Sequence, residues 1–145
     1  MPEKETLERA EEDKKEGKAP STQAGEFVRE EIEHVREGKH GARSTKQAIA
    51  IGLSKARRAG VNLPPPKKGS KKTRKQAARD LKKGKKKTAK KSAKRSRATS
   101  RALKREGHSA ASKRALSRQA HAAARKRSAA SRSRSAKKAA KTRKK

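Results

Sequence analysis

The sequence contains no cysteine, tryptophan or tyrosine, and its only aromatic residue is Phe27. Without cysteine, neither a disulfide framework nor thiol chemistry is available. Because aromatic residues make up 1% and apolar residues 28% of the chain, most of it cannot bury enough surface to offset the conformational entropy lost on folding. The composition therefore predicts a mostly disordered chain with a small all-α part.

Long hydrophobic runs are also missing. No run of 18 apolar residues is present, and the acidic N-terminus lacks the apolar stretch of a signal peptide. We therefore expect a soluble cytoplasmic protein without membrane insertion. No Ser-His-Asp, phosphate-loop or paired-carboxylate arrangement stands out, so we expect no enzymatic activity, no cofactor and no small-molecule substrate.

The four histidines are His34, His40, His108 and His121. Their spacings match no metal-ligand pattern, and no cysteine is available to complete one. The sequence therefore predicts no metal site.

Acidic residues are scarce beyond residue 37. Residues 1–37 hold 12 acidic and 7 basic side chains, whereas residues 38–145 hold 2 acidic and 40 basic ones, which gives the net charge of +33. This asymmetry indicates a polyanionic partner, and nucleic acid is the most abundant polyanion. Sequence-specific readout is not expected, because zinc-ligand sets, a basic zipper and aromatic stacking platforms are all missing.

A helical hairpin is predicted in the less basic part of the chain. Residues 22–36 and 45–59 each carry one apolar face, and Phe27 lies on the first. The second helix starts at Ser44, a capping residue, and stops at Gly60. Its apolar face consists largely of small residues, so a partner helix can approach closely. Such a unit is near the lower size limit for independent folding, and forming a homodimer or binding a ligand would stabilise it.

Composition divides the chain into four parts. Residues 1–20 form an acidic and mixed-charge segment in which nothing would hold a helix in place. Residues 21–63 form the small helical domain, and residues 64–72 form a Pro/Lys linker. Residues 73–145 form a basic low-complexity tail that is disordered or conditionally helical, apart from a short third helix at 74–83.

Candidate nucleic-acid contacts follow from this charge distribution. The polar face of the second predicted helix presents cations, and the linker and tail add many more. Such side chains neutralise phosphates whatever the base sequence. The residues expected to contact nucleic acid are Arg43, Lys46, Lys55, Arg57, Arg58, Lys67, Lys68, Lys71, Lys72, Arg74, Lys75, Lys82, Lys83, Lys85, Lys86, Lys87, Arg101, Arg105, Arg114 and Arg118.

Residues 38–60 carry a further pattern. Gly38 to Gly41 read GKHG, Ser44 to Ser54 read STKQAIAIGLS, and Ala56 to Gly60 read ARRAG. This pattern resembles small bacterial proteins grouped as domain of unknown function 6496, a resemblance that implies a bacterial source and carries no established activity. The Lys/Ala-rich tail separately resembles those of bacterial histone H1-like proteins.

These observations favour a non-enzymatic, largely sequence-nonspecific DNA-binding protein of the bacterial nucleoid. RNA binding or association with the ribosome is the main alternative, because the same electrostatics serves both polymers. A third alternative is a protein-interaction module that uses the acidic N-terminal segment.

Overall fold

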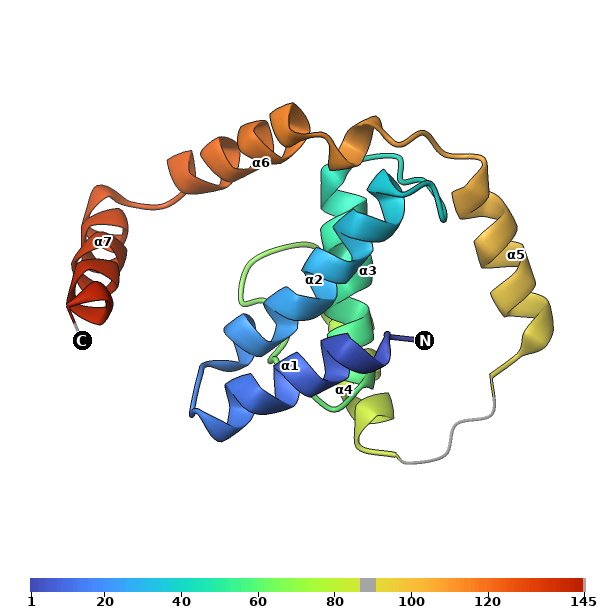
Figure 1. The fold of residues 1–145 in the computed structure, drawn as a ribbon, viewed down its shortest axis with the longest axis horizontal. Coiled ribbons are helices and arrows are strands. Elements are labelled where there is room, and N and C mark those ends of the chain that lie inside the picture. Colours follow the sequence, from blue (N-terminus) through green and yellow to red (C-terminus); the bar gives the residue numbers. More distant parts are fainter. Residues whose placement is uncertain (87–90, 145) are drawn as a thin grey trace.

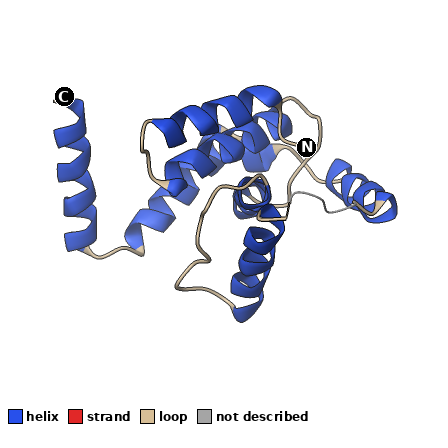
Figure 2. Cartoon of the chain, turned by 90° about the horizontal axis from the view of Figure 1, so that it is seen from below, coloured by secondary structure: helices blue, strands red, loops and turns tan. Residues whose placement is uncertain are grey.

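The computed structural model of the chain describes residues 1–86 and 91–144. Over these residues it forms helices and connections without strands (Figure 2). The elements in order are α1 (Lys4–Lys15), α2 (Pro20–Arg36), α3 (Thr45–Arg58), α4 (Lys71–Gly84), α5 (Ala93–Lys104), the 3-10 turn η1 (Ser109–Ala111), α6 (Lys113–Arg125) and α7 (Ala129–Arg143). The prediction of a mostly disordered chain with a hairpin and one short third helix is therefore wrong.

Each helix of the basic half begins with a serine cap. The side-chain oxygens of Ser70, Ser92, Ser112 and Ser128 accept hydrogen bonds from the backbone N–H three residues further on, at the start of α4, α5, α6 and α7 respectively. A serine in this position satisfies a backbone donor that the helix leaves free, and alanine, which follows in quantity, has the highest helix propensity. The composition predicted disorder in this part of the chain because an average over residue types contains no information on the positions of the capping serines.

Helices α2 and α3 lie where the hairpin was predicted and run in opposite directions (Figure 1). The two backbones come very close at Gly52, where an added Cβ would lie 2.6 Å from the Cα of Val28. Ser44 caps α3 as expected, with its Oγ 3.2 Å from the Gln47 N–H. The Gln47 side chain in turn accepts from the Arg43 N–H at 2.7 Å.

Helix α1 packs on α2, so the expectation that nothing holds residues 1–20 in place is wrong. Ala10 is buried in one apolar cluster with Ala24, Phe27, Ala56 and Val61. Phe27 is completely buried at the centre of this packing. Beside the cluster, the Arg9 guanidinium lies 2.8 Å from a Glu26 carboxylate oxygen. The apolar contact of α1 with this cluster depends on one small residue, Ala10, which is not conspicuous in a sequence rich in charged residues.

Helix α4 packs on the C-terminal end of α3. It extends beyond the predicted range of 74–83, and Ser70 caps its first turn. Asp80 is buried and accepts hydrogen bonds from Ser54 Oγ at 2.6 Å and Arg58 Nε at 2.8 Å. Burial raises the pKa of Asp80, but these donors, together with Gln76, outweigh burial and hold that pKa below its ordinary range.

Part of the predicted tail is folded onto the α2–α3 hairpin. The connection before α3 pairs with the last turn of α5 and the connection that follows it. The Gly41 N–H donates to the Leu103 carbonyl at 2.9 Å, and the Ala42 N–H donates to the Gly107 carbonyl at 3.0 Å. Gly41 is required for this approach, because an added Cβ there would lie 1.9 Å from the Glu106 carbonyl oxygen.

The turn η1 completes a second apolar cluster. Ala110 and Ala111 are buried there against residues of α2 and α3 and their connection, namely Ile32, Val35, Ala42 and Ala48. Hydrogen bonds fix the same turn, since Thr45 Oγ1 donates to the Ala110 carbonyl at 2.6 Å and Arg36 Nε donates to the Ala111 carbonyl at 2.8 Å. Residues 103–111 therefore belong to the folded core.

Two cationic arms extend from this anchored turn. Helix α5 leaves the core on one side, and α6 with α7 leaves on the other (Figure 1). None of these three helices has a buried residue. Within the described part of the chain, no helix has the length and apolar character needed to cross a membrane.

Candidate nucleic-acid interface and histidine–glutamate cluster

Three predicted contact residues at the end of α3 have partners inside the protein. Lys55 Nζ lies 2.6 Å from Glu31 Oε2. Arg57 is buried and donates to the Leu63 carbonyl at 3.1 Å, and burial lowers the pKa of its guanidinium despite the opposing charge of Asp80. Arg58 Nε donates to Asp80 at 2.8 Å. These three cations stabilise the packing of α2, α4 and the proline-rich connection, which limits what they can offer a phosphate.

Two predicted residues at the start of α3 face solvent. The Arg43 side chain is 81% exposed and lies 3.8 Å from Glu106 Oε1, a distance at which water screens the pair strongly. Lys46 is exposed on the first turn of the helix. Both are therefore placed to reach a phosphate without first breaking the core.

The remaining predicted contacts lie on the connection before α4, on α4 and on the arms. Lys87 lies outside the described residues. All the others are exposed, which is the condition for phosphate contact: Lys67, Lys68, Lys71, Lys72, Arg74, Lys75, Lys82, Lys83, Lys85, Lys86, Arg101, Arg105, Arg114 and Arg118.

The prediction omitted most cations of the two arms. They are exposed, and they lie on helices that carry no acidic residue. Their signal was visible in the sequence as a charge run of one sign, but a disordered tail gave no reason to single them out. They are Lys94, Arg95, Arg97, Lys104, Lys113, Arg125, Arg132, Arg134, Lys137, Lys138, Lys141 and Arg143.

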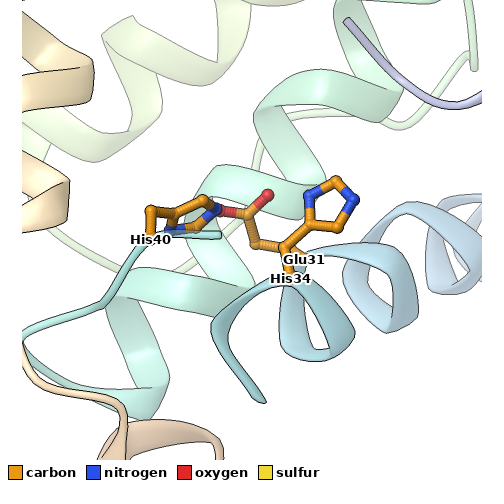
Figure 3. Close-up of side chains that lie close together, drawn as sticks. All are labelled: Glu31, His34 and His40. Carbon is orange, nitrogen blue, oxygen red and sulfur yellow. The ribbon is translucent and has the colours of Figure 1, made fainter. Parts of the chain in front are cut away.

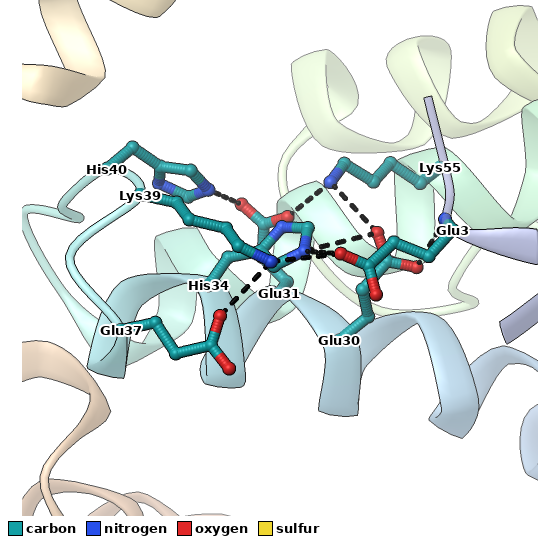
Figure 4. A network of polar contacts seen from close by, with 8 residues as sticks. All are labelled: Glu3, Glu30, Glu31, His34, Glu37, Lys39, His40 and Lys55. Atoms are coloured by element: carbon teal, nitrogen blue, oxygen red, sulfur yellow. Dashed lines mark hydrogen bonds and ion pairs between the residues drawn. The ribbon is translucent and has the colours of Figure 1, made fainter. Parts of the chain in front are cut away.

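A different kind of site lies between α2, α3 and the N-terminus. Glu30 and Glu31, neighbours on α2, are 2% and 0% exposed. Lys55 of α3 lies within ion-pair distance of both carboxylates, at 3.7 and 2.6 Å. Figure 4 shows these residues as the centre of a network that also includes Glu3, His34, Glu37, Lys39 and His40.

Glu3 closes this network from the N-terminal side. Its backbone N–H donates to Glu30 Oε2 at 3.1 Å, which ties the start of α1 to α2. Its carboxylate accepts from His34 Nε2 at 2.9 Å and from Lys39 Nζ at 3.0 Å. The hydrogen bond from His34, followed by that from Lys39, lowers the pKa of Glu3 to about 2.

Glu31, His34 and His40 form a group within this network that could hold a metal ion. One ligand atom from each lies within 4.8 Å of the others. The Glu31 carboxylate lies between the two imidazole rings (Figure 3), and its Oε1 is 3.1 Å from His40 Nε2. The spacing of these residues in the sequence does not reveal the group, because the fold brings His40 of the α2–α3 connection back over α2.

The N-terminal part of the chain matches one protein-family model. Residues 4–68 match the sequence model of a family of unknown function (DUF6496). This confirms the resemblance expected from residues 38–60 and extends it over α1, α2 and α3. The match ends before α4, so it takes in the histidine–glutamate cluster and leaves out the cationic arms. No curated protein and no solved structure matches the chain.

Proposed function

We propose that this protein is a non-enzymatic, histone H1-like DNA-binding protein that acts on duplex DNA with little regard to base sequence, in the manner of a bacterial nucleoid-associated protein. The observation that carries the proposal is the exposure of the cations on α4 to α7 combined with the scarcity of acids there. Asp80 and Glu106 are the only acidic residues beyond residue 37, and both face cations of α3 or its lead. The charge of the arms is therefore left for an external polyanion.

The mechanism is neutralisation of backbone phosphates. Each Lys or Arg that approaches a phosphate releases condensed counterions, so affinity falls steeply as salt rises. The arms favour DNA that is contacted at more than one place, because α5 and α6–α7 leave the core on opposite sides (Figure 1). Such an arrangement supports bridging or compaction of a duplex, with the α1–α3 core fixing where the two arms begin.

A salt series on unrelated duplexes tests this proposal. We expect similar affinities for duplexes of different sequence and a steep, linear fall of log K with log salt concentration. Absence of duplex binding, or affinity that salt does not change, would overturn it. A competition between duplex DNA and structured RNA in the same assay separates DNA from RNA as the preferred polymer, and a clear preference for RNA would favour the ribosome-associated alternative.

A further inference from the structure

We propose that Glu31, His34 and His40 bind one divalent transition-metal ion of the Zn²⁺ class, a site that is independent of the nucleic-acid interface. Two imidazoles and one carboxylate are a donor set that suits Zn²⁺ and Co²⁺ and does not suit Mg²⁺ or Ca²⁺, which prefer oxygen ligands throughout. The proposal rests on hydrogen bonds that orient both rings, on the burial of Glu31 and on the charge of its surroundings.

Each imidazole is oriented by a partner on the nitrogen that points away from Glu31. His40 Nδ1 lies 3.0 Å from the Gly41 carbonyl, which can only accept, so Nδ1 carries the proton and Nε2 of the neutral ring presents a lone pair. His34 Nε2 lies 2.9 Å from the Glu3 carboxylate, which likewise accepts, so Nδ1 of the neutral ring is left with a lone pair. A carbonyl or carboxylate behind the ring is the usual outer partner of a metal-binding histidine.

Glu31 supplies the anion at which the two lone pairs meet. It is completely buried, and neither of its carboxylate oxygens has a hydrogen-bond partner among the described residues. Lys55 and His40 do lie within ion-pair distance of these oxygens, at 2.6 and 3.1 Å, but without the directions that a hydrogen bond needs. Lys55 therefore places a positive charge beside Glu31 Oε2. On the other side, a lone pair of Glu31 Oε1 faces the lone pair of His40 Nε2.

One of the ligand distances is already close to what a bound cation needs. Adjacent ligands about 2.1 Å from a tetrahedral Zn²⁺ ion are separated by roughly 3.4 Å. The Oε1–Nε2 separation of 3.1 Å lies close to this value. The three ligand atoms are separated by up to 4.8 Å, so the His34 ring has to move toward the other two ligands when the ion binds. The His34 side chain is only 12% exposed, and Glu3 contacts its outer nitrogen. Water would supply the fourth ligand.

The local charge also favours a cation, although the whole chain carries +33. The network contains the carboxylates of Glu3, Glu30, Glu31 and Glu37 against the ammonium groups of Lys39 and Lys55 (Figure 4). The four carboxylates outnumber the two ammonium groups by two negative charges, and the Glu31 carboxylate is completely buried. A divalent cation would balance this excess.

Titration of the full-length protein, purified without a histidine tag, with Zn²⁺ tests the site directly. We expect one ion per chain by calorimetry and, by imidazole nitrogen NMR, metal-induced shifts at His34 Nδ1 and His40 Nε2. His121, which is exposed on α6, should not shift. If the His34 and His40 rings stay insensitive to added Zn²⁺, the proposal is overturned.

Two variants refine the test. His40→Asn keeps an amide donor close to the position of Nδ1 but removes Nε2, and we expect it to weaken Zn²⁺ at least about tenfold, in line with the loss that even outer partners cause. His121→Asn, an exposed position on α6, is the matched control and should leave affinity unchanged. Equal Zn²⁺ affinity in both variants, or displacement of Zn²⁺ by Mg²⁺ at similar concentration, would overturn the assignment. DNA affinity should be the same with and without Zn²⁺, so this proposal and the proposed function fail separately.

Discussion

Thr45, the first residue of α3, donates through Oγ1 to the carbonyl of Ala110, 65 positions further along the chain and 2.6 Å away. The hydroxyl is buried, and the bond joins the central hairpin to a segment that composition assigns to a disordered tail. A buried polar pair of this kind is costly to break on one side, because the remaining group stays unsatisfied. The basic half of the chain is therefore anchored at a defined place.

The first prediction concerns this anchor. Gly41→Ala should destabilise the docking of residues 103–111 by about 1–3 kcal/mol, because its Cβ would meet the Glu106 carbonyl oxygen at 1.9 Å. Hydrogen exchange of the Gly41 and Ala42 amides, which donate across this contact, measures the effect. Gly107→Ala is the control, since nothing lies within 4 Å of a Cβ there. Unchanged exchange in Gly41→Ala would show that the two connections do not pair.

The second prediction concerns the contact between α2 and α3. Gly52→Ala should destabilise the protein by about 1–3 kcal/mol, because the new methyl group would lie 2.6 Å from the Val28 Cα and the helices would have to separate. Denaturant unfolding measures this. The same substitution at Gly25, on the exposed side of α2, meets nothing within 4 Å and should instead stabilise the helix by about 0.5–1 kcal/mol. Equal effects at the two sites would contradict the proposed packing.

Periodicity and capping signals located the hairpin well. The apolar positions around Phe27 and the small residues around Gly52 repeat at helical spacing, and their burial follows from it. Composition misled where the fold depends on few residues. Ala110 and Ala111 pack against the hairpin because they are small and because Gly41 allows the backbone at Glu106 to approach closely. Neither property alters the average amino-acid composition of the tail.

The candidate sites divide in the same way. The exposure of the tail cations was predictable, because a run of one charge has no internal partner to bury it. In the sequence, nothing distinguishes Lys55, Arg57 and Arg58 of α3 from the exposed cations. In the fold, each of them contacts a carboxylate or carbonyl group of another segment. The group of Glu31, His34 and His40 was beyond reach, because the path of the α2–α3 connection decides where His40 lies.

The third prediction concerns the pH dependence of the α3–α4 contact. The pKa of Asp80 is lower in the folded protein than its ordinary value of 3.8, so the unfolded chain binds its proton first. The stabilisation is therefore complete above pH 3.8 and is lost as pH falls through the lower, folded value. Asp80→Asn should lower the free energy of unfolding by about 2 kcal/mol near neutral pH, the scale of a hydrogen bond to a charged group. The difference should disappear at a pH low enough to protonate the Asp80 carboxylate of the wild type.

Urea unfolding of the wild type and Asp80→Asn across an acid pH series measures this difference. Arg79→Gln, on the exposed side of the same helix, is the control and should change stability by less than about 0.5 kcal/mol at any pH. A difference between Asp80→Asn and the wild type that stays constant down to the most acid point would show that the Asp80 charge does not hold α4 in place.

The last prediction separates the arms from the core in DNA binding, by removing three charges from each. Glutamine has a helix propensity close to that of lysine, so lysine-to-glutamine changes on an exposed helix remove charge and leave the helix intact. The arm variant changes Lys137, Lys138 and Lys141 of α7, and the matched core variant changes Lys4, Lys14 and Lys15 of α1. If α7 lies along phosphates, the arm variant should reduce the slope of log K against log salt by up to about 3, since each phosphate contact contributes about 0.9. The core variant should leave the slope unchanged, because α1 is rich in glutamate that repels DNA. Equal slopes for the two variants would mean that α7 does not touch the duplex and that the binding charge lies in α4 to α6.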